Sequence, residues 1–191
     1  DLLSYEVTYF NTRLENELVP FENADLLTYY RNAGSSTRNG AEATFWIRPV
    51  DLVTLQATYS RTDAKFDDYV VGSNNLSGKK VPGLAPQQAH GSIRIGPRQW
   101  YLQLEAEYTD EVPVNDDNSA AFAEAYTLFG ARVGANAIRV GSFEISPFAG
   151  VQNLTDETYV AAVAVNAFGN RYFEPGPGRT FYVGGTVAVS R

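Results

Sequence analysis

The clearest feature of the sequence is a strict alternation of apolar and polar side chains over residues 100–108. Every second position is apolar: Trp100, Leu102, Leu104, Ala106 and Tyr108. The positions between them are mostly polar or charged: Tyr101, Gln103, Glu105 and Glu107. A period of two predicts a β-strand with one face in an apolar environment. Aromatic rings at both ends of the apolar face, and a length near the ~9–11 residues of a tilted membrane strand, favour a strand that crosses a bilayer.

The same pattern recurs along the chain and predicts about eight strands in all. It is clear in five further segments: 3–13, 41–48, 53–60, 89–95 and 179–190. Two more segments, 123–134 and 139–154, are interrupted by glycines. In the second of them, the residues expected to face outward are Phe143, Ile145, Ala149 and Val151.

The connections between these segments alternate between short and long. Short ones are expected at 49–51, 96–99 and about 135–138, and long ones at 15–26, 67–85, 110–122 and 157–177. Short turns on one rim and long loops on the other are typical of an outer-membrane β-barrel. The sequence therefore predicts an all-β fold of antiparallel transmembrane strands. Asn39-Gly40 and residues 153–156 are candidate turns, and a glycine in a strand can also admit a closely packed group.

The composition of the chain argues against several classes of function and structure. The formal net charge of −7 argues against a nucleic-acid partner, because such proteins usually present a basic face to phosphate. The chain has no Cys, so it can form neither a disulfide nor a thiolate metal site. No run approaches ~18 apolar residues, so no transmembrane helix is expected.

The sequence shows no catalytic or metal-binding constellation, and we expect neither enzyme activity nor a cofactor. His90 is the only histidine, and its position on a polar face favours a hydrogen-bonded wall residue. Residues 115–118 carry oxygen ligands but lack the glycine and distal glutamate of an EF-hand, so a solvated loop is favoured.

Several charged residues fall on the inward face of the predicted strands: Glu6, Glu42, Arg94, Glu105, Glu107 and Arg132. Charges that face protein must be paired or hydrated. In a wide barrel they would face water or an internal domain, whereas in a closed barrel of about eight strands they would pair within a filled interior.

Three stretches resemble the last third of the barrel of TonB-dependent receptors. Residues 31–42 (RNAGSSTRNGAE) are similar to that family's "NAG…GvE" strand, residues 150–159 (GVQNLTDETY) to its "NLtDkkY" segment, and residues 175–184 (PGPGRTFYVG) to the "PGR" entry into the last strand. They occur in the family's order and together span nearly the whole chain.

The resemblance implies that residues 1–191 are the C-terminal segment of a barrel of about 22 strands, without the plug domain and its TonB box. It also implies a place in the bacterial outer membrane and uptake of a scarce nutrient, most plausibly a ferric siderophore. The partners would be outer-membrane lipid, the remainder of the barrel, the plug, and TonB acting through the plug.

Ligand contact is expected from the long loops and the upper lumen, where aromatic faces and positive charge occur together. The candidates are Tyr69, Lys79, Lys80, Arg171 and Tyr172. Such groups suit an anionic iron chelate.

Two other hypotheses remain open at this point. The chain could form a self-contained eight-strand outer-membrane barrel with a structural or adhesive role, in which its first and last strands would pair. It could also be a barrel hydrolase, which would need His90 beside a serine and a carboxylate.

Overall fold

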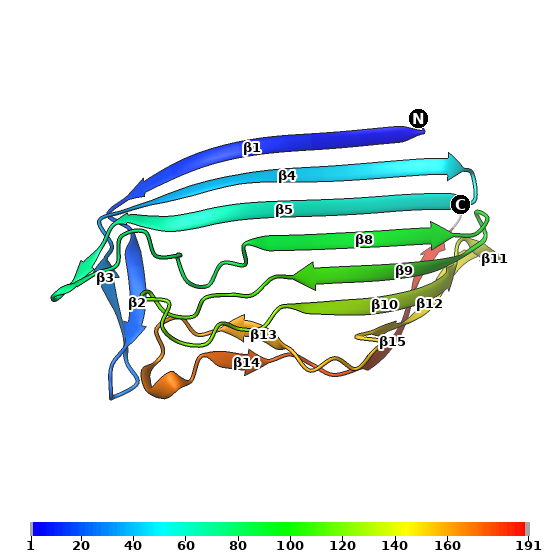
Figure 1. Ribbon diagram of the computed structural model, residues 1–191. Coiled ribbons are helices and arrows are strands. Elements are labelled where there is room, and N and C mark those ends of the chain that lie inside the picture. The colour runs from blue at the N-terminus through cyan, green and yellow to red at the C-terminus, as the bar shows by residue number, and fades with distance from the viewer. Residues whose placement is uncertain (1, 190–191) are drawn as a thin grey trace.

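Long antiparallel strands form a single curved sheet in the computed structural model, which describes residues 2–189 (Figure 1). The sheet order is β1-β4-β5-β8-β9-β10-β12, and β15 pairs with the far side of β12. The short strand β11 continues the line of β10 along the same partner, β12. The bounds are β1 Leu3–Glu15, β4 Ser35–Val50, β5 Val53–Asp68, β8 Gln87–Ile95, β9 Trp100–Thr109, β10 Tyr126–Ala135, β11 Ile138–Val140, β12 Phe143–Gln152 and β15 Thr180–Val189. The predicted all-β antiparallel architecture is confirmed.

The remaining elements are short and lie in the connections. They are β2 Leu18–Glu22, β3 Thr28–Asn32, β6 Val70–Val71, β7 Asn74–Asn75, β13 Val160–Val163, the 3₁₀ turn η1 Phe168–Asn170 and β14 Phe173–Pro175. In the part of the chain that the structure describes, there is no helix with the length and apolar character needed to span a membrane.

Short turns and long loops lie at opposite ends of the strands, as the alternating connection lengths predict (Figure 1). One short turn differs from its expected place: the chain reverses at Gly141 and Ser142, not at 135–138. Asn136 and Ala137 only interrupt the strand, with Ala137 at φ 49°. Pairing with β12 resumes after them with the register shifted by one residue, so that Ile138 lies opposite Ile145.

The strands β4 and β5 are each 16 residues long and extend well beyond the predicted 41–48 and 53–60. Their extensions toward the loops pair in register, with Thr37 opposite Lys65 and Asn39 opposite Asp63. Backbone pairing therefore continues where the apolar alternation has ended. The last strand ends at Val189 in the described residues, and residue 190 of the predicted range lies outside them.

Asn39-Gly40 does not form a turn, because both residues lie inside β4. Gly40 faces Phe10 of β1, whose ring occupies the space that a side chain at this position would need. The alternative expectation, a glycine that admits a closely packed group, is the correct one. The second candidate turn is confirmed: the side-chain oxygen of Asn153 accepts a hydrogen bond from the backbone N–H of Glu157 at 2.8 Å.

The two faces of the sheet differ in chemistry. Cross-strand register places apolar residues opposite one another on one face, for example Leu55 opposite both Ile47 and Ile93. The outward positions predicted in β12 follow the same rule, since Ala149 lies opposite Val183 and Val151 opposite Phe181. This face is open, with Phe181 75% and Val183 84% exposed.

The opposite face carries the charged residues and is more crowded. Glu105 lies opposite Ser92, and Arg132 lies opposite Gln103, which settles the phase of Arg132 as inward. Curvature brings side chains together on the concave side of a sheet and spreads them on the convex side, so we assign the polar face to the concave side. Tyr101 on this face is only 7% exposed.

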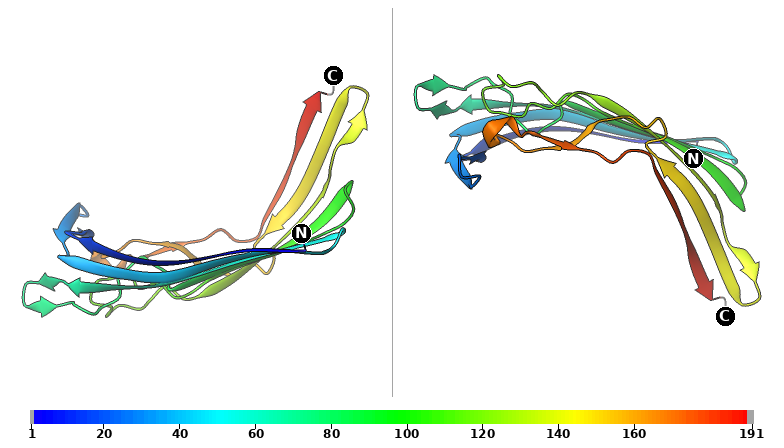
Figure 2. Two further views of the ribbon diagram at one scale, coloured as in Figure 1. Left: turned by 90° about the horizontal axis from the view of Figure 1, so that it is seen from above. Right: turned by 90° about the horizontal axis from the view of Figure 1, so that it is seen from below.

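The sheet curves through a half-barrel and stays open (Figure 2). Among residues 2–189, β1 pairs with β4 alone and β15 with β12 alone. A self-contained barrel was expected to pair its first and last strands. In the described residues these two strands do not pair with each other.

Candidate ligand-binding loops at the open rim

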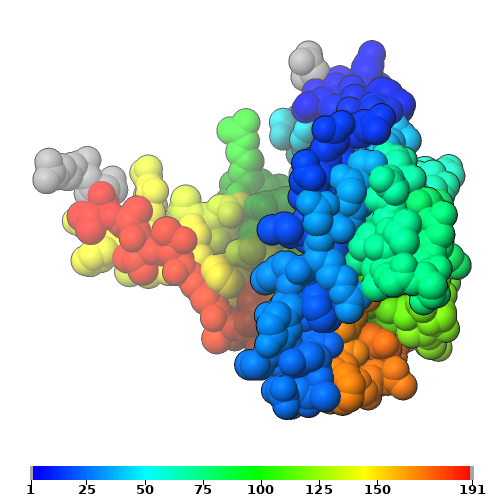
Figure 3. Space-filling view, turned by 90° about the vertical axis from the view of Figure 1, so that its left-hand side faces the viewer, coloured from blue at the N-terminus to red at the C-terminus, as the bar shows by residue number. Residues whose placement is uncertain are grey.

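The long loops are folded structures with a core of their own. The hairpins β2–β3, β6–β7 and β13–β14 project from the same rim of the sheet, and Figure 3 looks onto this rim. Buried apolar side chains from the first two loops and from the adjoining end of β5 pack together: Val19, Ala33, Ala64, Phe66, Tyr69, Leu76 and Val81. The most buried part of the described chain thus lies at the loops, because the sheet alone has no second layer to pack against.

A hydrogen-bonded pair, the buried Asp116 and the partly buried Asn166, connects all four loops, and we call it the loop node. The Asp116 carboxylate accepts hydrogen bonds from the Tyr69 hydroxyl and the Asn166 amide, both at 2.8 Å. The Asn166 side chain also donates to the backbone oxygen of Pro20 at 3.0 Å and accepts from the backbone N–H of Asp116 at 3.0 Å. The node therefore holds the loops in one arrangement.

The expectation of a solvated loop at 115–118 is wrong for Asp116, which is 5% exposed. Burial raises the pKa of its carboxyl group, against hydrogen bonds from Asn166 and Tyr69 that lower it. Within residues 2–189, no three histidine or acidic side chains are grouped closely enough to hold a metal ion.

Tyr69, a predicted ligand contact, lies beneath the loop surface with 2% exposure. Its ring packs on Phe66 with centroids 4.7 Å apart. Burial, together with the hydrogen bond to Asp116, raises the pKa of its hydroxyl. In this arrangement Tyr69 supports the loops and offers little surface to a ligand.

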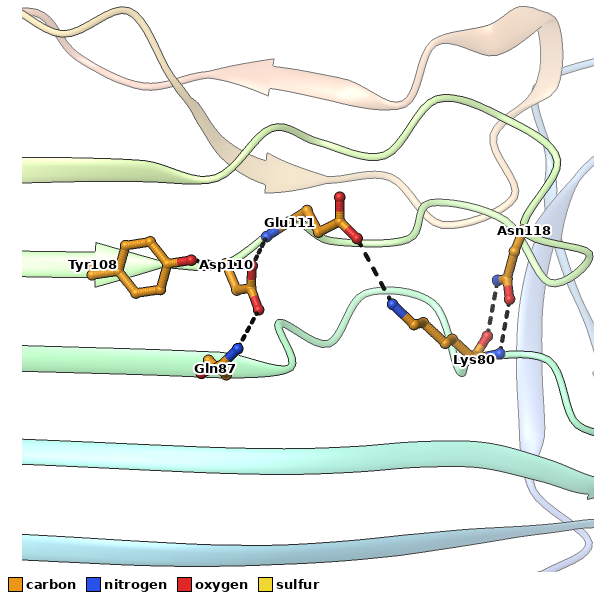
Figure 4. Close-up of polar contacts among 6 residues, drawn as sticks. All are labelled: Lys80, Gln87, Tyr108, Asp110, Glu111 and Asn118. Atoms are coloured by element: carbon orange, nitrogen blue, oxygen red, sulfur yellow. Dashed lines mark hydrogen bonds and ion pairs between the residues drawn. The ribbon is translucent and has the colours of Figure 1, made fainter.

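Lys80 has a similar connecting role between the second and third long loops (Figure 4). Its backbone N–H and C=O bond to the side-chain amide of Asn118 at 2.8 and 3.0 Å. Its ammonium group lies 3.8 Å from Glu111 and 5.3 Å from the centroid of the Phe122 ring. Lys79 beside it is exposed.

Nearer the sheet, the ends of these two loops are joined by Gln87, the first residue of β8, and Asp110, which follows β9 (Figure 4). The Gln87 amide donates to the Asp110 carboxylate at 3.1 Å, and the Tyr108 hydroxyl donates to the other carboxylate oxygen at 3.1 Å. These contacts continue the link made by Lys80 down to the ends of the strands.

Arg171 and Tyr172 lie in the fourth loop, close to the first. The Arg171 guanidinium donates to Glu22 at 2.8 Å, so part of its charge is already compensated. Tyr172 is half-buried and lines a cavity of about 260 Å³ between the loops. The other lining residues are Phe21, Glu22, Arg31, Val71, Asn74, Leu76, Asn115, Asp116, Asp117 and Asn166.

Arg31 is a residue of this cavity that the sequence did not single out as a contact. Its guanidinium lies 3.7 Å from the centroid of the Phe21 ring. The combination of a cation and an aromatic face, expected at the rim, is therefore present at Arg31 and Phe21. The sequence carries no signal for it, because the contact depends on the pairing of β2 with β3, which places Val19 opposite Arg31.

The five predicted contact residues are not brought together at one place. Of these, Tyr172 lines the loop cavity, Arg171 is bonded to a wall residue of it, and Tyr69 lies below the surface. Neither Lys79 nor Lys80 is among the lining residues. With Arg31 beside Glu22, Asp116 and Asp117, the cavity wall carries mixed charge with an excess of acid, whereas positive charge was expected.

A second cavity, of about 220 Å³, lies lower on the concave face. It is lined in part by His90, Glu105, Glu107 and Tyr159. His90 on β8 lies opposite Glu107 on β9, which agrees with the polar position inferred for it.

Solved structures of receptors and transporters share this fold. The siderophore receptor PiuA from Acinetobacter baumannii matches with a TM-score of 0.72 and 19% identity, over 97% of this chain and 26% of that one. The ferric citrate transporter FecA in its unliganded form matches with a TM-score of 0.78 and 19% identity, over 98% and 29%. The copper transporter OprC matches with a TM-score of 0.74 and 17% identity, over 100% and 29%. The chain thus spans between a quarter and a third of the length of each.

The sequence itself matches the model of a protein family. Residues 1–154 match the family described as "TonB dependent receptor-like, beta-barrel". This range includes every strand of the sheet from β1 to β12 and the first three long loops. Because it covers most of the chain, the protein belongs to the TonB-dependent receptor family and carries sequence of its β-barrel.

Proposed function

We propose that this chain is the C-terminal segment of an outer-membrane receptor barrel of about 22 strands, and that the receptor takes up a scarce nutrient with energy supplied through TonB. The family consists of receptors and transporters, and its barrels belong to the bacterial outer membrane. The plug through which TonB would act, the remaining strands and the surrounding lipid are the partners of this proposal.

The observation that carries the proposal is the form of the sheet. It is an open half-barrel with an apolar convex face, and its long loops are fastened to one another at one rim. An exposed apolar face of this extent is stable in lipid but not in water. Connected loops above a concave polar wall provide a place for a ligand to bind before it enters the barrel.

The ligand class proposed is a ferric siderophore. The structural neighbours include receptors named for siderophores and for ferric citrate, and also a copper transporter. In this chain we propose the loop cavity as the contact region, with Arg31, Tyr172 and Arg171 facing the ligand. The acidic wall of the cavity favours a chelate that brings cationic or hydrogen-bond donor groups beside its anionic centre.

The test is iron uptake by the full-length polypeptide that contains this chain, produced in a Gram-negative host that lacks its own siderophore receptors. Cells would be offered a panel of ⁵⁵Fe-loaded catecholate, hydroxamate and citrate chelates, with and without a functional TonB protein. We expect TonB-dependent uptake of one chelate class. Uptake that is equal in the presence and absence of the receptor for every chelate, or that does not need TonB, would contradict the proposal.

The contribution of the cavity is tested in the same assay. Arg31→Gln removes the stacked cation, and Lys79→Gln removes an exposed lysine outside the cavity as a matched control. We expect Arg31→Gln to raise the chelate concentration needed for half-maximal uptake about tenfold, the loss of one charge-assisted contact. Equal effects of the two substitutions would exclude the cavity as the contact region.

A further inference from the structure

The outward, apolar face of the sheet is hollowed at its centre. Cross-strand register aligns Phe45, Ala57, Gly91, Ala106 and Phe129 in one row. The three small residues of this row lie on β5, β8 and β9, between the two phenylalanine rings. A Cβ atom added at Gly91 would meet nothing within 4 Å, so the space above this row is open.

The next row toward the loops narrows the hollow to a slot. This row aligns Tyr59, Ala89 and Tyr108, so that one small residue lies between two tyrosine rings. On the short-turn side the hollow ends at larger side chains, since Ile93 lies opposite Leu104. Two adjoining cavities, of about 500 and 360 Å³, follow the rows. We call the depression over the Gly91 and Ala89 rows the apolar groove.

Hydrogen bonds fix the loop end of the apolar groove. The Tyr59 hydroxyl donates to the side-chain oxygen of Gln87 at 2.7 Å. The carboxylate of Asp110 accepts from the Gln87 amide and from the Tyr108 hydroxyl, both at 3.1 Å (Figure 4). Because both hydroxyl groups are held by the same chain of polar contacts, the slot between the tyrosine rings keeps its width.

An arginine with no acidic partner lies beside this loop end. Arg61 lies opposite Gln87 and shares a face of β5 with Tyr59, because alternate residues of a strand point the same way. Its side chain is exposed and forms no ion pair with any of residues 2–189. Lys65, further along β5, differs in being paired with Asp63 at 2.8 Å. The charge of Arg61 is therefore available to an anion from outside the chain.

Polar side chains continue along the same outward face toward the loops. Asn11 lies opposite Asn39, and Thr37 lies between Arg13 and Lys65 on the neighbouring strands. Amides, a hydroxyl and cations thus replace the apolar side chains above the groove. Such groups bind sugar hydroxyls and phosphate. We call these five residues the polar belt.

We propose that the apolar groove, Arg61 and the polar belt bind one lipid of the outer leaflet, whose head group is a phosphorylated saccharide. An acyl chain fills the groove, Arg61 binds a phosphate through its planar guanidinium group, and the belt binds the sugar hydroxyls. The proposal rests on the proposed function in one respect, which is that the apolar face meets the membrane and the long loops are extracellular.

The pairing of the strands favours a lipid chain over a protein segment in the groove. Strand β8 is hydrogen-bonded to both β5 and β9, so the floor offers no free backbone groups. A peptide that lies in hydrocarbon must satisfy its own backbone N–H and C=O groups, whereas an acyl chain has none. The cation and the amides lie at the loop end and not within the groove, which is where the head group of such a lipid would be.

The experiment measures lipid binding to the full-length polypeptide, purified in detergent and stripped of its native lipid. Native mass spectrometry compares lipid A with its phosphates, lipid A after phosphatase treatment, and phosphatidylglycerol. We expect intact lipid A to bind about tenfold more tightly than the treated form, the effect of one charge-assisted contact. Phosphatidylglycerol, which has a phosphate but no saccharide, should also bind more weakly than intact lipid A. Equal affinities for all these probes overturn the proposal.

The phosphate contact is tested with Arg61→Gln, and Arg98→Gln is the matched control because Arg98 is an exposed arginine in a short turn. We expect Arg61→Gln to remove most of the difference between intact and treated lipid A, and to leave the affinity for the treated form unchanged. Arg61→Lys, which keeps the charge but loses the planar fork, should keep part of the difference. Equal effects of the two glutamine substitutions overturn the assignment of the phosphate to Arg61.

The groove is tested with Ala106→Leu, whose larger side chain fills the floor beside Gly91. Ala149→Leu is the matched control, since it makes the same change on the same face of the sheet, outside the groove. We expect Ala106→Leu to weaken the binding of intact and treated lipid A by the same factor, because both forms carry the same acyl chains. Equal affinities of the two leucine variants for lipid A overturn the proposal.

Folding of each variant is checked by the shift in electrophoretic mobility on heating. If Ala106→Leu does not fold, Gly91→Leu replaces it, because the space at Gly91 is open. Dimers of the wild-type polypeptide that bind no lipid would assign the face to a second copy and overturn the proposal. Iron uptake by cells that carry the receptor separates the two proposals: TonB-dependent uptake without any preference for intact lipid A contradicts the lipid site alone.

Discussion

At the scale of single residues, the most consequential side chains are two polar ones that connect loops, the buried Asp116 and the partly buried Asn166. Asp116 and Asn166 satisfy each other through two hydrogen bonds, at 2.8 and 3.0 Å, and each reaches a different further loop. A buried acceptor that loses its donor costs more than the hydrogen bond itself contributes, because the group stays desolvated. The loop node is therefore the position where one substitution should change the arrangement of all the loops.

We predict that Asp116→Ala increases the rate at which an added protease cleaves the loops of the full-length protein. The substitution leaves the Tyr69 hydroxyl without its acceptor, at a cost of about 1–3 kcal/mol, and leaves the Asn166 amide with only the backbone oxygen of Pro20. Asp25→Ala is the control, because Asp25 is an exposed acid in the first loop. Similar cleavage of both variants would show that the node does not hold the loops.

The pKa of Asp116 leads to a prediction for pH dependence. Burial raises this pKa in the folded loops above its ordinary value of 3.8. The folded state therefore binds the proton more tightly than the open state, so the contribution of Asp116 to loop stability is greatest below pH 3.8 and declines as the pH rises through the raised pKa. Loop opening measured by hydrogen exchange should show this decline in the wild type and lose it in Asp116→Asn. A decline of equal size in Asp116→Asn would assign it to other groups.

At the scale of the strand and the loop, the sequence predicted the position of a strand well where one whole face of that strand is apolar. Alternation located β9 to within one residue, because lipid imposes an apolar side chain at every second position. The extensions of β4 and β5 lie beyond the apolar part of the sheet. Their backbones still pair there, but their side chains do not alternate between apolar and polar. The loop hairpins depend on contacts between distant segments, and for this reason neither the burial of Tyr69 nor the cavity at Arg31 could be foreseen.

A substitution at Gly40 tests the packing between the adjacent strands β1 and β4, because Gly40 lies against the ring of Phe10. A Cβ at Gly40 would meet the Phe10 ring and also come within 2.5 Å of the backbone oxygen of Arg61. We predict that Gly40→Val reduces the yield of folded protein, with an overpacking cost of about 1–3 kcal/mol. Gly91→Ala is the control because a Cβ at Gly91 meets no atom within 4 Å. The yield is measured by the heat-dependent shift in electrophoretic mobility, and equal losses in the two variants would mean that packing at Gly40 is not the cause.

At the scale of the whole molecule, the two faces of one curved sheet have to satisfy two different solvents. Ala57 and Thr58 are neighbours on β5 and point to opposite faces, since Ala57 lies opposite Phe45 and Thr58 opposite Thr44 and His90. An arginine on the lipid face near the middle of a bilayer costs about 2–4 kcal/mol, whereas on the inner wall it can be hydrated or paired. If the faces are assigned correctly, a charged side chain should therefore be unfavourable at Ala57 and tolerated at Thr58.

We predict that Ala57→Arg lowers the folded fraction of the full-length protein in lipid vesicles by roughly one to three orders of magnitude at a urea concentration near the unfolding midpoint, the effect of about 2–4 kcal/mol, and that Thr58→Arg changes it little. The two substitutions introduce the same side chain and charge one residue apart, and β-propensity alone would penalise the loss of Thr58 more than the loss of Ala57. A greater loss at Ala57 therefore reports the environment of the face. Equal tolerance of both would mean that the apolar face does not meet hydrocarbon. A larger loss at Thr58 would reverse the assignment of the faces, and the polar wall with its charged residues would then have to be placed on the lipid side of the sheet.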